Sequence, residues 1–186
     1  VTILLLVLGY VGLDSLLSNT RANSWENSLR VVIYPINADG SAKTKQYIDQ
    51  IEVSQFDDIA ALVKKEAERY GVNLLKPMMI NLAKPIETLP PIIPEDKNIL
   101  SVAWWSLQLR YWSWKEDHYE GIRPHIRAYA LYFDPQIHSQ LAHSTGLEKG
   151  KIAVIQLFAD RRHTLQNNVI LLHELLHTIG ATDKYD

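Results

Sequence analysis

The sequence has 186 residues, of which 47% are hydrophobic, and a formal net charge of -2 at pH 7. This length allows one good hydrophobic core, and the balanced charge gives no basic surplus for binding nucleic acid. Cysteine is absent, which excludes disulfides, thiolate metal sites and cysteine nucleophiles. Any metal must therefore be held by His, Asp and Glu, a ligand set that suits catalytic zinc better than structural zinc.

The chain begins with an apolar run, because residues 1–13 contain no charged side chain. A bilayer-spanning helix needs about 20 apolar residues, so the run is short for a complete span. We interpret residues 1–17 as the remnant of a membrane anchor or signal peptide, which predicts a membrane-anchored or exported protein. An amphipathic or buried N-terminal helix is the alternative. Residues 18–28, rich in Ser and Asn, are predicted to form a linker.

From residue 29 onward the sequence predicts one domain of alternating strands and helices. In chain order the pattern indicates a strand at 30–36, a helix at 55–70, a strand at 78–83, a helix at 98–114, strands at 125–134 and 152–159, and a helix at 164–179. The segment 143–151 is predicted to be a polar loop. This order predicts an α/β (α+β) fold, in which helices pack on a mixed, twisted sheet.

The helix predicted at 98–114 holds four of the five tryptophans. Helical spacing puts Trp104, Leu107, Tyr111 and Trp114 on one side. We expect this side to be buried between sheet and loops, because large aromatic side chains are usually buried. The alternative is a membrane-facing or substrate-facing patch, since Trp and Tyr are enriched at bilayer interfaces.

The end of the chain, HELLHTIGATDKYD, has the residue types and spacing of a catalytic metal site. His173 and His177 are four residues apart, so a helix places both imidazoles within reach of one ion. Glu174 is placed to act as general base on a zinc-activated water. Gly180 can adopt the left-handed conformation that ends the helix, and Asp183 can then return as a third ligand.

The alternative for this segment is a buried helix with two ordinary core histidines. The apolar residues Leu165, Val169, Leu172, Leu176 and Ile179 fall on one face of the predicted helix, which indicates a central, buried element. Burying two His and a Glu without partners would cost several kcal/mol. A metal ion would compensate for that cost, and we therefore favour the metal site.

Residues 173–183, HELLHTIGATD, resemble the extended zinc signature of the metzincin metalloproteases, H-E-x-x-H-x-x-G-x-x-H/D. The aspartate in the last place and the Asp-x-Tyr that follows resemble the snapalysin-like branch. The resemblance implies a zincin-like N-terminal subdomain with a central zinc-binding helix, Zn²⁺ on His173, His177 and Asp183, and Glu174 as base. By the same analogy, residues 152–159 are expected to form the edge strand along which an extended substrate lies.

Two further residues near the C-terminus are candidates for the site, and the sequence departs from the metzincin pattern in one respect. Tyr185 either hydrogen-bonds the metal site or packs, and Asp186 is a rival oxygen ligand. Metzincins place a methionine turn beneath the metal, after the third ligand, but the only methionines here are Met78 and Met79. We therefore expect residues 29–186 to be a metalloprotease-like domain without its C-terminal subdomain.

These observations predict a zinc metalloendopeptidase that hydrolyses peptide bonds in peptide or protein substrates. Two alternatives are a non-catalytic metal-binding or interaction module, and a zinc amidase that acts on a non-protein amide.

Overall fold

The computed structural model describes residues 26–94, 98–148 and 150–183. Their elements, in chain order, are β1 (Leu29–Asn37), α2 (Ala42–Ile48), the 3-10 turn η1 (Val53–Phe56), α3 (Asp57–Arg69), β2 (Met78–Leu82), α4 (Ile99–Glu116), β3 (Ile126–Phe133), β4 (Thr145–Leu147), β5 (Ile152–Phe158), the 3-10 turn η2 (Arg161–His163) and α5 (Thr164–Thr178). Every predicted strand and helix is present, and α2 and β4 are additional. The predicted anchor at residues 1–17 and most of the linker lie outside the described residues.

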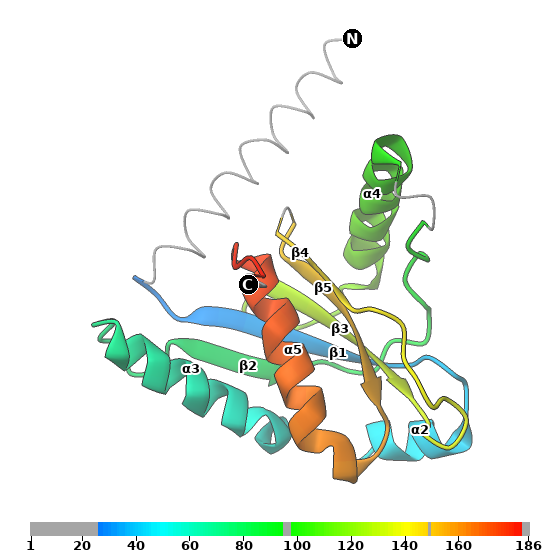
Figure 1. The fold of residues 1–186 in the computed structure, drawn as a ribbon, viewed down its shortest axis with the longest axis horizontal. Coiled ribbons are helices and arrows are strands. Elements are labelled where there is room, and N and C mark those ends of the chain that lie inside the picture. Colours follow the sequence, from blue (N-terminus) through cyan, green and yellow to red (C-terminus); the bar gives the residue numbers. More distant parts are fainter. Residues whose placement is uncertain (1–25, 95–97, 149, 184–186) are drawn as a thin grey trace.

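The five strands form one sheet in the order β2-β1-β3-β5-β4 (Figure 1). β1, β2, β3 and β5 run parallel, and β4 runs antiparallel to β5. The predicted mixed sheet with packed helices is thus confirmed. No helix among the described residues is both long and apolar enough to cross a bilayer.

The prediction that residues 152–159 form the edge strand is wrong. β5 is an interior strand, in which Ala153 pairs with Ala128 of β3 on one side and with Gly146 of β4 on the other. The edge strand beside β5 is β4, within the segment that we predicted to be a polar loop, and β2 forms the other edge. The three residues of β4 are too few to show an alternating pattern, so the sequence gives no strand signal there.

Connection handedness distributes the helices over the two faces of the sheet. The chain moves one way from β1 to β2 and back the other way from β2 to β3, so right-handed crossovers place α3 and α4 on opposite faces. Val31 and Ile33 of β1 pack on the face that α3 and α5 cover. Val32 and Tyr34 pack on the face that α4 covers. Because both faces are buried, β1 is a continuous apolar run.

The structure reverses the predicted orientation of α4. Trp105, Leu109 and Ser113 are buried, while the side predicted to be buried is exposed, with Trp104 at 64% and Trp114 at 74%. On the buried side the Tyr129 hydroxyl donates to Ser113 Oγ at 2.7 Å, and the Trp105 indole N–H donates to the Pro91 carbonyl at 2.9 Å.

The face on which α5 packs also differs from the predicted one. Leu171, Leu175 and Thr178 are buried, whereas Leu165 is 71% exposed and Val169 is 68% exposed. Two asparagines near the start of the helix fasten it in this orientation. The Asn167 side chain donates to the Phe158 carbonyl at 2.9 Å and accepts from the Phe158 N–H at 3.1 Å, and Asn168 donates to the Gln55 carbonyl at 2.7 Å.

Candidate metal centre

The orientation of α5 turns the two histidines of the motif outward and its glutamate inward. The side chain of His173 is 47% exposed and that of His177 is 22% exposed, so neither is a core histidine. Glu174 is buried, at 7% exposure. The cost of burying polar side chains without partners, which favoured a metal over core histidines, therefore applies to Glu174 alone. Support for the metal site has to come from the ligand geometry.

The helix ends in a left-handed turn at Gly180, where φ is 95°. The Gly180 N–H donates to the His177 carbonyl at 3.2 Å, and the Ala181 N–H donates to the Leu176 carbonyl at 3.1 Å. This is the hydrogen-bond pattern of a Schellman cap, which reverses the chain after a helix. The reversal brings Asp183 back over the last turn of α5, as the spacing predicted.

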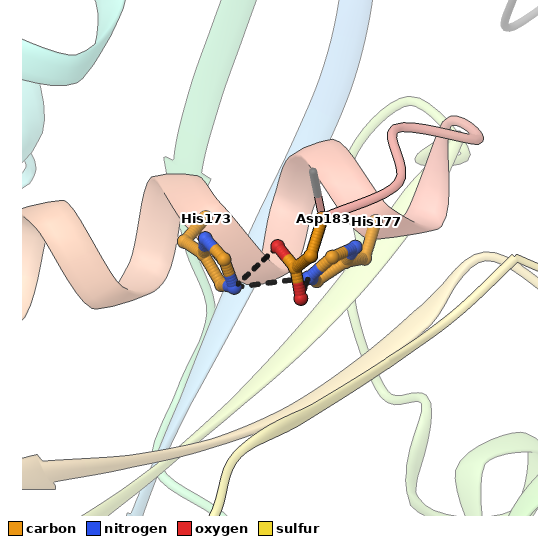
Figure 2. Close-up of side chains that lie close together, drawn as sticks. All are labelled: His173, His177 and Asp183. Atoms are coloured by element: carbon orange, nitrogen blue, oxygen red, sulfur yellow. Dashed lines mark hydrogen bonds and ion pairs between the residues drawn. The ribbon is translucent and has the colours of Figure 1, made fainter. Parts of the chain in front are cut away.

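Three ligand-type atoms converge at this turn (Figure 2). The Nε2 atoms of His173 and His177 are 2.9 Å apart. Asp183 Oδ1 lies 3.6 Å from Nε2 of His173, and its Oδ2 lies 3.5 Å from Nε2 of His177. Two ligands each 2.0–2.1 Å from one tetrahedral ion are roughly 3.3 Å apart, so these spacings fit a shared zinc ion.

A hydrogen bond sets which nitrogen of His177 is free to coordinate. Its Nδ1 lies 2.9 Å from the Ala181 carbonyl oxygen, and a carbonyl only accepts, so Nδ1 carries the proton. In the neutral ring, Nε2 then presents a lone pair toward His173 and Asp183. A backbone carbonyl on the far nitrogen is a usual partner of metal-ligating histidines.

Glu174 is buried beside the ligand residues, where its carboxylate accepts a hydrogen bond from the Gly146 N–H of β4. Burial raises the pKa of its carboxyl, and Asp183 adds to that effect, while His173, His177 and a hydrogen bond from the Gly146 N–H act in the opposite direction. The net shift is upward. A raised pKa suits a carboxylate that must both take and return a proton near neutral pH.

Gly146 allows β4 to lie directly against the metal-binding helix. A Cβ at this position would collide with the Glu174 carbonyl oxygen and lie 2.9 Å from Cβ of His177. No side chain fits there, and the short distance lets the Gly146 N–H reach the Glu174 carboxylate.

Lys151 supports the other end of the site. Its side chain is buried, at 2% exposure, and Nζ donates to the Thr178 carbonyl at 2.9 Å, in the last turn of α5. A cation at a helix C-terminus is favoured by the helix dipole. Burial lowers the pKa of this ammonium, although Glu148 acts in the opposite direction.

A hollow of about 570 Å³ opens beside the candidate site, between the loop 139–144, β5 and α5. It reaches His173 and Glu174, and its lining combines polar Gln156 with apolar Phe158 and Ile170. The hollow is thus contiguous with the predicted reacting groups.

The structure brings together His173, His177 and Asp183 as predicted ligands, with Glu174 beside them, whereas Tyr185 and Asp186 lie outside the described residues. Gly146, Lys151 and Asn167 also shape the site, and sequence reasoning did not identify them. Only Asn167 gave a usable signal, because an asparagine inside a helix often has a side-chain partner.

Comparison of the chain with protein-family models, with curated proteins and with solved structures gives no match.

Proposed function

We propose that the protein is a zinc-dependent metallopeptidase in which His173, His177 and Asp183 hold the ion and Glu174 is the general base. The observation that carries this proposal is the convergence of three ligand atoms within 4.8 Å of one another, next to a buried carboxylate that is not one of them. Exposed clusters of this kind are common without an ion, so the support lies in the combination with the oriented His177 ring and the buried Glu174.

When bound, zinc supplies a Lewis acid for the scissile carbonyl and lowers the pKa of a coordinated water. Glu174 accepts the proton from the attacking water and passes it to the leaving amine nitrogen. The Gly146 N–H donates a hydrogen bond to the Glu174 carboxylate. This bond fixes the position of the base relative to the attacking water.

The sheet edge supports a peptide as substrate. β4 pairs with β5 on one side and is the edge strand nearest the candidate site in the sheet that the described residues form. An extended peptide can add to such an edge through main-chain hydrogen bonds. This arrangement is compatible with the expected metzincin-like subdomain, with β4 in the role that the sequence analysis gave to β5. The proposal retains an exported or membrane-anchored location from the apolar residues 1–17.

The test combines metal analysis with a base-deleted variant of the full chain. We expect the wild type to bind about one zinc per chain and to cleave members of a broad peptide panel. Glu174→Gln should keep the zinc and lose about 10²–10⁴-fold in cleavage rate. Glu68→Gln, on the exposed end of α3, is the matched control and should change neither.

Four results would contradict the proposal at different points. A chain that takes up no zinc after reconstitution has no metal site of this kind. A zinc-loaded chain that cleaves no peptide is a non-catalytic metal-binding module, and one that hydrolyses only non-protein amides is an amidase. Cleavage that survives Glu174→Gln removes Glu174 as the base.

A further inference from the structure

The outer side of α4 carries a continuous row of large apolar side chains. We call it the aromatic stripe and define it as Leu100, Ala103, Trp104, Leu107, Tyr111 and Trp114, residues that all fall on one helix face. All six are exposed, and the five large ones range from 57% for Leu107 to 77% for Leu100. Exposed stripes of this kind mark contact sites on soluble domains.

The fold itself does not use this stripe. α4 reaches the sheet through Trp105 and Leu109, which join the core cluster around Tyr129. The indole N–H of Trp105 is already satisfied by Pro91. Figure 1 shows α4 apart from the layer of α3 and α5, so no described helix packs on its outer side.

One exposed cation borders the stripe, which is compatible with an anionic surface. The charged residues of α4 are Arg110, Lys115 and Glu116. Lys115 is exposed and borders the stripe on one side, and Glu116 falls on the opposite side of the helix. Arg110 is half-buried, with its guanidinium beside Gly150. A lysine beside a Trp, Tyr and Leu face is typical of helices that lie in the headgroup region of a bilayer.

The side chains within the stripe point to lipid rather than to a buried protein interface. Trp104, Trp114 and Tyr111 each combine an apolar ring with one polar N–H or O–H group, which suits a level where one end is apolar and the other wet. The chain also contains a second apolar element, residues 1–13, outside the described part. Stable attachment to a bilayer usually requires two such elements.

We propose that the aromatic stripe of α4 lies in the interfacial region of an anionic lipid bilayer. This contact is independent of the metal centre and of the reaction that it performs.

The absence of cysteine from the sequence gives a direct test on the full chain. Leu107→Cys and Leu165→Cys each provide one labelling position for an environment-sensitive fluorophore. Leu165 is the matched control, since it is an exposed leucine on α5, on the opposite face of the sheet. With phosphatidylcholine–phosphatidylglycerol vesicles, the label at 107 should shift to the blue and be quenched by brominated lipid. The label at 165 should do neither.

A second measurement does not depend on labelling. Trp104→Ser with Trp114→Ser should lower partitioning into the same vesicles by about tenfold, with circular dichroism and unfolding midpoint unchanged. The matched control is Leu165→Ser with Val169→Ser, which removes exposed apolar side chains from α5 and should leave partitioning unchanged.

The proposal is overturned if the vesicle-bound chain leaves the label at 107 in water, or if the two positions respond alike. It is also overturned if the folded tryptophan variant partitions like wild type. A blue shift at 107 that appears without lipid, together with a dimer in light scattering, would assign the stripe to a second copy of the chain instead.

Discussion

Gly146 determines how closely the edge strand approaches the metal-binding helix. We predict that Gly146→Val destabilises the metal-free protein by about 1–3 kcal/mol, because the added side chain must displace the Glu174 carbonyl or the His177 side chain. Urea unfolding measures this effect. Thr145→Val, a near-isosteric change on the same strand, should cost less than about 1 kcal/mol. Equal midpoints for Gly146→Val and wild type would show that β4 moves away from α5 at no cost.

The residues that could be predicted at the site are those whose relation is local. His173, Glu174 and His177 lie on one helix and Asp183 follows its cap, so helical spacing and the turn at Gly180 predict their proximity. Gly146 and Lys151 reach the site only because β4 and β5 pack against α5. Nothing in their immediate neighbours encodes that contact, and both residues fall in the segment predicted to be a polar loop.

The C-terminal end of α5 depends on the buried ammonium of Lys151. We predict that Lys151→Met destabilises the protein by about 1–3 kcal/mol, because it leaves the buried Thr178 carbonyl without its donor. Zinc affinity should fall about 10-fold, since the last turn of α5 holds His177 in position and leads into the turn at Gly180. Unfolding and zinc titration calorimetry measure the two effects.

Lys65→Met, at an exposed position on α3, is the control for this substitution and should alter neither quantity. A Lys151→Met protein with lower stability and unchanged zinc affinity would separate the fold of α5 from the geometry of the ligands.

All three predicted helices are present, although α2 was not predicted, and the buried faces of α4 and α5 were predicted wrongly. Helical periodicity indicates a buried face only when the opposite face is polar. α4 carries Trp105 and Leu109 on one side and Trp104 and Trp114 on the other, so periodicity could not distinguish them. In α5 the apolar residues also surround the helix, and the bonds of Asn167 and Asn168 select the buried side.

On the scale of the whole molecule, a partly buried ionic network joins the end of α4 to the sheet. Asp117 accepts from the Tyr34 hydroxyl at 2.6 Å and from Arg127 at 2.6 Å. Burial raises the pKa of Asp117, but the hydrogen bonds from Tyr34 and Arg127 outweigh it and lower the pKa overall. The pKa of Asp39, which follows β1, is also lowered, because the hydrogen bonds that its carboxylate accepts from backbone N–H groups and hydroxyls outweigh the effect of burial.

We predict acid lability from these two carboxylates. Each is ionised more easily in the folded than in the unfolded chain, so its stabilisation is present above the unfolded pKa of about 3.9 and is lost as pH falls through the lower folded value. When urea unfolding is measured from pH 7 to pH 2, the urea concentration at the midpoint should therefore decrease at pH values below about 4.

Asp117→Asn is the variant that isolates one of these groups. It should be less stable than wild type by about 1–3 kcal/mol at pH 7, and the difference should shrink in acid. Asp58→Asn, on an exposed turn of α3, is the control. A stability gap that stays constant down to pH 2 would exclude Asp117 as a source of the acid response.

The opposite placement of α4 and α5 on the sheet has a consequence for reach. If the aromatic stripe rests on a bilayer, the sheet and a helix layer separate the lipid from the metal centre by roughly 20 Å. Peptide bonds at or within the membrane surface would then lie too close to the lipid to reach the metal centre. The accessible targets would be segments that extend well into the aqueous phase. The thickness of the domain would thus set the distance from the membrane at which a substrate chain is cleaved.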